Sequence, residues 1–297
     1  MEIISVIIIT YKRQVSILKR AVESVCNQTY KNIEIILVND DPEDQHHSEE
    51  IKNMIKEYDK DIYYYSYDKN RGSNYARNFG ISKAKGQFLA FLDDDDEWYK
   101  NKLEKQMLIM KTDSEIALVS CGFDFVKDEK VIGHKENALY KDCDLKYLLA
   151  DNYVGGTSFP LLRREAVKDV GGFDINQKSC QEYDLWIRLR MKYKFSMVDE
   201  SLGKYYLSGD SVYRKSNDRF FQGDYMILEK YNDIFNTHKK AYMFHLNRMS
   251  FNFLCNQNWN YFFKYRKMVW KLKGFSLDKS IFVYMLKTKL NMYRGNV

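Results

Sequence analysis

Hydrophobic residues in the first hundred positions fall into short continuous runs separated by stretches with helical spacing. The continuous runs, most of them rich in β-branched side chains, cover residues 3–9, 33–38, 62–66 and 87–92. Runs of this length without polar alternation predict strands that are buried on both faces of a sheet. Between them, residues 17–25 and 73–85 place apolar side chains on one face of a helix. The alternating order predicts an α/β fold with a mostly parallel sheet, right-handed crossovers and flanking helices.

After residue 98 the pattern is less regular, and after about 217 it is helical throughout. Helices are predicted at 99–111, 163–169 and 182–193, and strands at 116–126, 195–198 and 203–207. Four further helices are predicted near 218–235, 238–255, 258–273 and 277–293, with Ser276 as a plausible N-cap of the last. We therefore expect one domain over 1–210, in halves 1–98 and 99–210, and a helical extension over 211–297.

The net charge of +6 divides unevenly along the 297 residues. Residues 206–297 hold 16 basic and 6 acidic residues, or +10, which leaves −4 for residues 1–205. Five cysteines without a CxxC pair suggest neither a disulfide framework nor a zinc site. No apolar stretch of about 18 residues occurs, and the short N-terminal run lacks a basic leader, so we expect no spanning helix, no signal peptide and a cytoplasmic location.

Four consecutive aspartates, Asp93 to Asp96, directly follow the predicted strand 87–92. Their mutual repulsion is costly unless a cation or solvent offsets it. At the carboxyl edge of a sheet they would offer hard oxygen ligands, which suit Mg²⁺ or Mn²⁺ bridging to a diphosphate. The alternative is an acidic, solvated loop without a metal.

Four blocks stand out in the first 210 residues. They read VIIITYKR at 6–13, NQTYKNIEIILVNDD at 27–41, NRGSNYARNFGISKAKGQFLAFLDDDDEW at 70–98, and GGFD with CQEYDLWIRL within 171–189. Together, in this order and spacing, they resemble family-2 glycosyltransferases of the GT-A fold. The resemblance implies an inverting, metal-dependent transferase that uses a nucleotide-sugar donor.

The resemblance assigns donor binding to the ends of the predicted strands and to the helix at 73–85. The nucleotide-binding residues that it implies are Thr10, Tyr11, Arg13, Asp40, Arg77, Asn78, Asp93 and Asp94. Tyr11 would pack on the uracil ring, Arg13 would reach a phosphate, and Asp40 would accept the N3–H of uracil. Asp93 and Asp95 would hold the metal, as the family's Asp-x-Asp does. Arg77 has a second interpretation, in which it only balances the charge of the acidic loop.

The fourth block implies the catalytic base. An inverting transfer needs one carboxylate that removes the proton of the acceptor hydroxyl. The family pattern Glu-Asp-x-Asp-Leu-Trp appears here with Gln181 and Glu182 at its first two positions, so Glu182 is the favoured base and Asp184 the second candidate. Residues two apart on a helix face different directions, so one of the two should be structural. Many relatives carry a metal-binding His after the last strand, where this chain offers Asp210.

The expected function is transfer of a sugar from a UDP-sugar to a saccharide or lipid-linked saccharide, in cell-surface polysaccharide or glycoconjugate biosynthesis. A nucleotidyltransferase is the rival enzyme class, but it should carry a glycine-rich loop after the first strand, and residues 10–13 lack glycine. A catalytically inactive nucleotide-sugar-binding scaffold is the non-enzymatic alternative.

Basic and aromatic residues alternate through 239–294. Three interpretations compete: helices that pack on the first domain or on a second subunit, an interfacial surface that binds an anionic membrane, and a nucleic-acid site. Since the rest of the chain is acidic and shows no nucleic-acid motif, we expect no nucleic-acid partner. A homo-oligomer and a peripheral contact with the inner face of the cell membrane both stay open.

Overall fold

A computed structural model describes residues 2–135, 143–207, 217–255 and 257–273. It divides into two compact units, each built from segments that are not contiguous in sequence. The first unit comprises Met1–Cys143, Val154–Asn176 and Gln181–Leu207, and the second comprises Asp144–Tyr153, Gln177–Cys180 and Ser208–Val297. Residues 144–153 and 177–180 therefore group with the C-terminal helices, although they precede residue 210.

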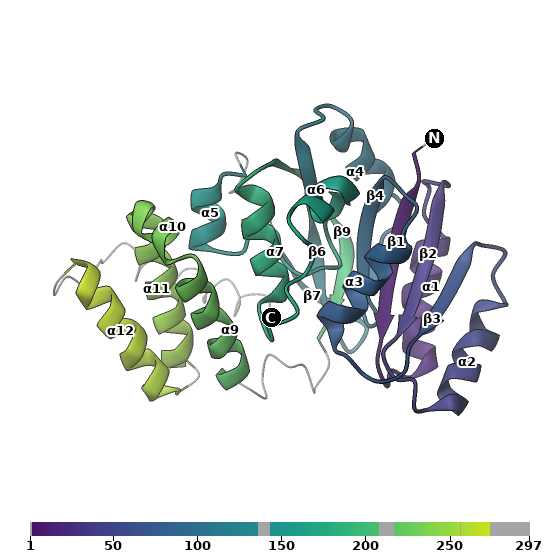
Figure 1. The fold of residues 1–297 in the computed structure, drawn as a ribbon, viewed down its shortest axis with the longest axis horizontal. Helices are drawn as coiled ribbons and strands as arrows, with labels where there is room; N and C mark the ends of the chain where they lie inside the picture. The colour runs from purple at the N-terminus through teal and green to yellow at the C-terminus, as the bar shows by residue number, and fades with distance from the viewer. Residues whose placement is uncertain (1, 136–142, 208–216, 256, 274–297) are drawn as a thin grey trace. The chain divides into compact units, whose positions relative to one another are not determined.

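The first half of the sheet is parallel, as the hydrophobic runs predict (Figure 1). Its strands lie in the order β3-β2-β1-β4. Their bounds are β1 Ile4–Thr10, β2 Ile33–Asn39, β3 Ile62–Ser66 and β4 Phe88–Asp93. Because β1 pairs with both β2 and β4, their carboxyl ends meet at one edge.

The second half of the sheet is mixed. It continues β4-β8-β6-β9-β5, with β7 paired to β6. The bounds are β5 Glu97–Trp98, β6 Ile116–Lys127, β7 Lys130–Lys135, β8 Leu161–Arg163 and β9 Lys194–Tyr206. The two strands predicted at 195–198 and 203–207 are one strand, β9, which pairs in parallel with β6 through several register shifts. The antiparallel strands β5, β7 and β8 were not predicted.

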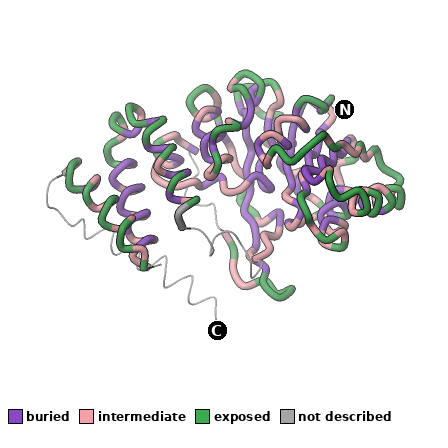
Figure 2. Tube along the Cα trace, turned by 60° about the horizontal axis from the view of Figure 1, so that its bottom comes forward, coloured by how far each residue is buried: buried purple, intermediate pink, exposed green. Residues whose placement is uncertain are grey.

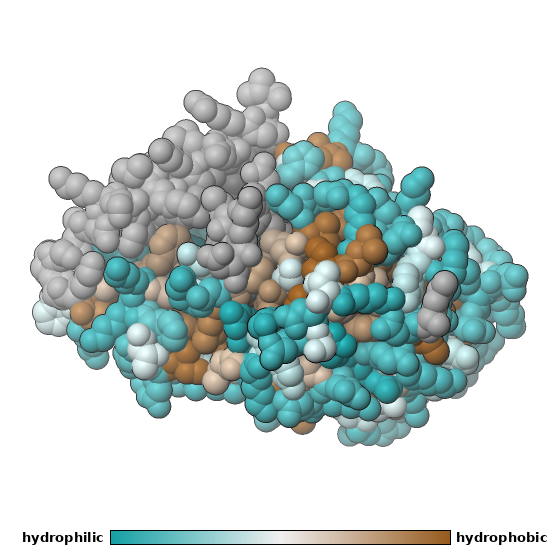
Figure 3. Space-filling view, turned by 90° about the horizontal axis from the view of Figure 1, so that it is seen from above, coloured by the Kyte–Doolittle hydropathy of each residue, from teal (hydrophilic) through white to brown (hydrophobic). Residues whose placement is uncertain are grey.

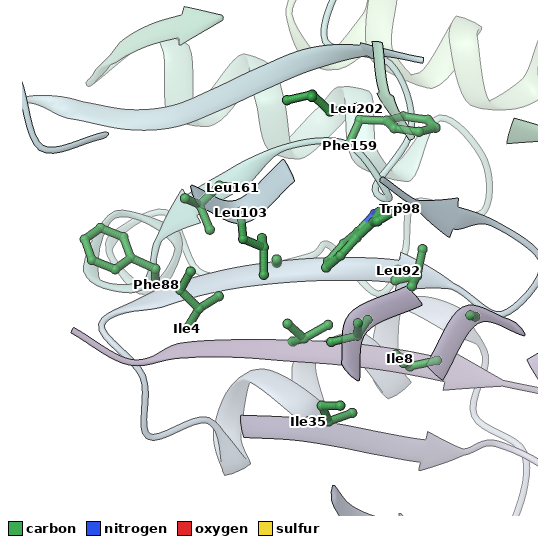
Figure 4. Packing of buried hydrophobic residues seen from close by; sticks show 14 of the residues in the cluster. Ile4, Ile8, Ile35, Phe88, Leu92, Trp98, Leu103, Phe159, Leu161 and Leu202 are labelled. Carbon is green, nitrogen blue, oxygen red and sulfur yellow. The ribbon is translucent and has the colours of Figure 1, made fainter. Parts of the chain in front are cut away.

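Helices cover both faces of the parallel strands. In the first unit they are α1 Val15–Cys26, α2 Gln45–Ile55, α3 Ser73–Lys83, α4 Lys102–Met110, α6 Arg164–Asp169 and α7 Gln181–Arg190. Ile4 and Ile8 join the hydrophobic cluster shown in Figure 4, to which α1, α2 and α4 contribute. Ile7 points to the opposite face, where a Cβ on Gly80 of α3 would lie 2.5 Å from its side chain. Glycine at this position thus permits the close approach of α3 to β1.

A buried lysine lies inside this hydrophobic cluster. Lys102 is fully buried, donates a hydrogen bond to Gln106 Oε1 at 2.8 Å, and lies 4.1 Å from the ring centre of Trp98. Burial lowers its pKa from 10.5 to about 8. Trp98 in turn donates its indole N–H to the carbonyl of Ser158, directly beneath the acidic loop.

The second unit is helical. It contains α5 Leu145–Ala150, α9 Asn217–Lys230, α10 Asn232–Thr237, α11 Lys239–Cys255 and α12 Trp259–Lys273. The helix predicted at 218–235 is interrupted at Tyr231, while those predicted at 238–255 and 258–273 are confirmed. The predicted helix at 277–293 and its N-cap Ser276 lie outside the described residues.

The core of the second unit combines apolar packing with one buried polar cluster. Phe253 of α11 packs against Tyr265 of α12, and Leu246 of α11 is also buried. Figure 2 shows buried residues along α11, interrupted by partly exposed ones. Asp224 accepts hydrogen bonds from His245 Nε2 at 3.1 Å and from the Tyr265 hydroxyl at 2.5 Å. Three helices are therefore joined through one carboxylate.

On the face that Figure 3 shows, the described side chains are mostly hydrophilic, with hydrophobic side chains in separate patches. Among the described residues, we find no helix that has both the length and the apolarity to cross a bilayer.

Candidate active site

The predicted donor-binding residues of β1, β2 and β4 meet at the carboxyl edge of the sheet. Thr10 pairs with Asn39 across β1 and β2, and Ile9 pairs with Asp93 across β1 and β4. Asp40 therefore follows the last residue of β2, and the acidic loop begins at Asp93, the last residue of the nearby strand β4. This edge is where open α/β sheets bind nucleotides.

The acidic loop is held by residues from the end of β1. Asp94 is buried, and it accepts hydrogen bonds from Thr10 Oγ1 and from Arg13 Nε, each at 2.8 Å. Arg13 also donates to Asp95 at 2.8 Å, so one guanidinium bridges two successive carboxylates. Burial raises the pKa of Asp94 to about 6, against the opposing effect of Arg13. Burial and the charge of Asp93 likewise raise the pKa of Asp95.

Asp96 orients the loop. It is buried and accepts a hydrogen bond from Ser158 Oγ at 2.5 Å, and the same hydroxyl accepts the backbone N–H of Asp93 at 3.1 Å. Thr157 donates to the side chain of Asp93 at 3.1 Å. The segment 157–158 thus fixes the first and last residues of the acidic loop.

The carboxylates of Asp93 and Asp95 fit a divalent cation. Their side chains stay 35% and 32% exposed, so both can offer oxygen atoms to a ligand. The described residues hold no group of three or more acidic, histidine or cysteine side chains arranged to enclose a metal. This donor set suits Mg²⁺ or Mn²⁺ held by one or two carboxylates together with the phosphates of a substrate.

Arg77 connects the acidic loop to the helix that carries the predicted base. It donates to Asp93 Oδ1 at 2.9 Å and to Gln181 Oε1 at 3.3 Å. Ser73, one turn earlier on α3, also donates to Gln181 Oε1, at 3.0 Å. Gln181, which replaces the acidic residue of the family pattern, therefore links α3 to the start of α7.

The carboxylate of Asp40 shapes the loop before α3. It accepts hydrogen bonds from the Tyr67 hydroxyl at 2.6 Å and the Asn70 side chain at 3.2 Å, and from the backbone N–H groups of Arg71 and Gly72 at 2.9 and 3.0 Å. Asp40 is buried. Its predicted contact with uracil would thus share a carboxylate that already holds this loop in place.

Asn78 holds the turn that precedes α7. Its side chain donates to the carbonyl of Phe173 at 2.7 Å and accepts the backbone N–H of Phe173 at 2.9 Å. A Cβ on Gly172, which has a φ of 69°, would lie 2.6 Å from Asn78 Oδ1. Both polar atoms of Asn78 therefore contact the protein backbone in this structure, and its predicted contact with the nucleotide stays a prediction.

The two candidate bases have different environments. Asp184 is fully buried and accepts hydrogen bonds from Arg188 Nε and NH2 at 2.9 and 2.6 Å. Glu182 is half-buried. Burial raises the pKa of Glu182; the charge of Asp93 adds to the shift, and Arg77 and Lys135 oppose it. Asp184 is therefore engaged in an ion pair that stabilises α7.

Tyr11, another of the predicted nucleotide-binding residues, lies at the surface. Tyr11 is 49% exposed, so its ring is available to a ligand. An open cavity of about 880 Å³ lies beside Arg13, between residues 12–16 and residues 41–50. Asp210, considered as a metal ligand in place of the family's His, lies outside the described residues.

Solved structures with a similar fold bind nucleotide sugars. The structure of Staphylococcus aureus TarS 1–349 in complex with UDP-GlcNAc matches with a TM-score of 0.64 at 16% identity, over 98% of this chain and 81% of that one. The mannosyltransferase PcManGT of Pyrobaculum calidifontis, solved with GDP-Man and Mn²⁺, matches with a TM-score of 0.65 at 14% identity, over 98% and 80%. At these identities the likeness establishes the GT-A fold.

Curated relatives in sequence are glycosyltransferases. An uncharacterised glycosyltransferase of Methanocaldococcus jannaschii is 29% identical over 68% of this chain and 70% of its own length. The Escherichia coli protein WfaP, a UDP-Glc:α-D-GlcNAc-diphosphoundecaprenol β-1,3-glucosyltransferase, is 31% identical over 65% and 72%. The match spans only 58% of a Rickettsia typhi relative and 31% of one from Rickettsia bellii.

The family model for glycosyl transferase family 2 matches residues 5–171. That range contains the parallel strands, the acidic loop and the residues around Arg77. The chain belongs to glycosyl transferase family 2.

Proposed function

We propose that this glycosyltransferase transfers a sugar from a UDP-sugar to a saccharide or lipid-linked saccharide, with inversion at the anomeric carbon. One observation carries the proposal. Arg77 and Gln181 link the partly exposed Asp93, at the sheet edge, to the start of the helix that bears Glu182. In this arrangement the proposed donor site and the proposed general base would lie close to each other.

The nucleoside would bind at the carboxyl edge of β1 and β2. Tyr11 has an exposed ring that can stack on a base, which favours planar ligands. Asp40 accepts hydrogen bonds from the backbone of residues 71 and 72, which connects the end of β2 to the start of α3. A carboxylate acceptor at this position favours a base that presents an N–H donor, as uracil does.

Asp93 and Asp95 would hold the metal, and Mn²⁺ and Mg²⁺ both suit their oxygen atoms. When bound, the metal would offset the negative charge that develops on the departing nucleoside diphosphate. In the structure described here, Arg13 supplies the compensating charge by bridging Asp94 and Asp95. Arg13 would turn from Asp95 toward the diphosphate when a donor binds, which is consistent with its one-third exposed side chain.

Glu182 would act as the general base. As a residue, Glu182 is less buried than Asp184, which Arg188 holds in a buried ion pair. Removal of the proton from the acceptor hydroxyl allows that oxygen to attack the anomeric carbon as the bond to the diphosphate breaks. A single displacement of this kind inverts the configuration. Burial raises the pKa of Glu182 toward the range in which a carboxylate accepts protons efficiently.

The choice of a UDP-sugar rests on relatives. WfaP, by its name, uses a UDP-glucose donor and a lipid-diphosphate-linked acceptor, and one structural neighbour was solved with UDP-GlcNAc. Another neighbour was solved with GDP-mannose. We propose UDP as the nucleotide and a lipid-linked saccharide as the preferred acceptor, in polysaccharide or glycoconjugate assembly.

Calorimetric titration tests the donor and metal assignments together. We expect UDP to bind the wild-type protein only when Mn²⁺ is present, and Asp95→Ala to lose this metal-dependent binding. Asp113→Ala is the matched control, because Asp113 pairs with Lys194 on the surface of the same unit. Metal-independent UDP binding, or GDP binding tighter than UDP binding, would refute the donor assignment. The anomeric configuration of the transferred sugar, read by NMR, tests inversion.

A further inference from the structure

The helix α12 combines a buried face with an exposed aromatic stripe. Its residues Tyr265 and Val269 are buried against the rest of the second unit. Trp259, Phe263 and Trp270 are 53%, 62% and 54% exposed. Spacings of four and seven residues place these three side chains within about 40° of one another around the helix, at 3.6 residues per turn. They form a stripe on the side that faces away from Tyr265. We call Trp259, Phe263 and Trp270 the aromatic stripe.

Basic residues flank the aromatic stripe on both sides. Residues 259–273 contain five Lys or Arg and no Asp or Glu. Around the helix, Arg266 lies on one side of the stripe, and Lys267 and Lys271 lie on the other. Lys267 and Lys271 are exposed. Arg266 donates to Asn247 Oδ1 at 2.7 Å, so it also fixes α12 to α11.

We propose that the aromatic stripe and its flanking lysines bind an anionic lipid bilayer, with α12 lying in the plane of the interface. Tryptophan and phenylalanine favour the boundary between headgroups and acyl chains, and lysines beside them bind anionic headgroups. A 15-residue helix is about 22 Å long, which suits an interfacial position and is too short to span a bilayer. The inference names one face within the range 239–294 and does not rest on the proposed transfer reaction.

Charge argues for lipid over a second copy of this chain. Two copies of α12 packed through the same stripe would bring two helices of charge +5 together with no acidic residue on either to offset them. Exposed like charges repel each other, whereas an anionic bilayer attracts all of them. Nucleic acid has the same sign of charge as the bilayer, and the experiment below separates the two.

The four tryptophans of the chain make a selective probe of this surface. Trp98 and Trp186 are buried, whereas Trp259 and Trp270 belong to the aromatic stripe. We expect tryptophan emission to shift to shorter wavelength when vesicles of phosphatidylcholine and phosphatidylglycerol are added, and to stay unchanged with phosphatidylcholine alone. Flotation of the protein with the same vesicles measures binding directly, and added salt should weaken it.

Variants on α12 complete the test. Phe263→Ser keeps both reporter tryptophans and should abolish most of the emission shift. The double variant Lys267→Gln and Lys271→Gln should weaken vesicle binding about 25-fold, at roughly a factor of five per lysine. Leu108→Ser is the matched control, because Leu108 is 68% exposed on the first unit and should bind as the wild type does. Thermal unfolding checks that each variant is folded.

Three outcomes would overturn the inference. They are equal binding to neutral and anionic vesicles, an emission shift with single-stranded DNA and none with vesicles, and unchanged vesicle binding in both α12 variants. Each leaves the donor-binding assay unaffected, since vesicle binding is measured without nucleotide. Failure of this inference is therefore distinguishable from failure of the proposed function.

Discussion

The buried lysine Lys102 yields a prediction whose magnitude depends on pH. Lys102 has a pKa lowered from 10.5 to about 8 because burial disfavours its charged form. Below pH 8 the Lys102 side chain is charged in both states. In the folded protein this charge is buried, whereas in the unfolded chain it is exposed to water. At pH 7 this costs about 3 kcal/mol of folding free energy, at 1.36 kcal/mol per pKa unit. As the pH rises through the folded and then the unfolded pKa, the cost disappears, and at pH 9.5 about 1 kcal/mol remains.

Lys102→Met removes the charge but also the hydrogen bond to Gln106 Oε1. Leaving that buried acceptor without its donor costs about 1–2 kcal/mol. The variant should therefore be more stable than the wild type by about 1–2 kcal/mol at pH 7 and should lose this advantage by pH 9.5. Apolar replacement of a buried charge by a side chain of similar volume is favourable for the same reason.

Urea unfolding at pH 7.0 and pH 9.5, followed by circular dichroism, measures the difference between the two proteins. Lys105→Met is the control, because Lys105 pairs with Glu200 at the surface and its loss should change stability by less than about 1 kcal/mol. A Lys102→Met effect that is the same at both pH values would refute a buried, titrating ammonium. If Lys102→Met destabilised the protein at pH 7 by more than Lys105→Met does, the cost of burying the ammonium would not exceed the cost of the lost hydrogen bond, and the prediction would be wrong.

Three further predictions concern the candidate site. Glu182 must be ionised to accept a proton, and its pKa is raised from 4.5, so kcat/KM should fall with decreasing pH through a midpoint above 4.5. Glu182→Gln should lower kcat by about 10²–10⁴-fold. A pH midpoint at or below 4.5 would contradict the assignment of Glu182 as the base. Asp184→Asn should destabilise the protein by about 2–4 kcal/mol in urea because Arg188 loses its buried partner, and an unchanged midpoint would show that the ion pair is not structural. Gly172→Ala should lower the free energy of unfolding by about 1–3 kcal/mol, because the new Cβ would meet Asn78 and the backbone φ is 69°. Gly156→Ala is the control and should have a smaller effect, since Gly156 has open space around it. Equal effects of the two substitutions would count against the steric argument.

The parallel half of the sheet was predictable because its signals are local. Continuous apolar runs such as 3–9 and 33–38 identify buried strands without reference to distant residues. The short strand β8 has three residues, too few to show a period. The predicted break between 198 and 203 reflects shifts in how β9 pairs with β6, which change its side-chain pattern without ending the strand.

The candidate site likewise has contacts that the sequence predicts and contacts that it does not. Thr10, Arg13 and Asp94 were predicted together, and they do contact one another, because adjacent strand ends bring them to one edge. The contacts of Thr157 and Ser158 with the acidic loop were not predicted. Their hydrogen bonds to the acidic loop join residues more than 60 positions apart, and no spacing along the chain reveals such a contact.

The second unit is built from segments that lie far apart in the sequence, and this has a consequence for synthesis of the chain. Leu148 and Leu149 of α5 are fully buried, and α5 packs on α11, where Arg248 donates to the carbonyl of Ala150. A ribosome that adds about 5–20 residues per second needs roughly 5–20 s to extend the chain from α5 to the end of α11, about 100 residues later. For that interval α11, the helix on which α5 packs, has not yet been made. The nascent protein should therefore present a short apolar segment to chaperones at this one stage, and release it when α11 emerges.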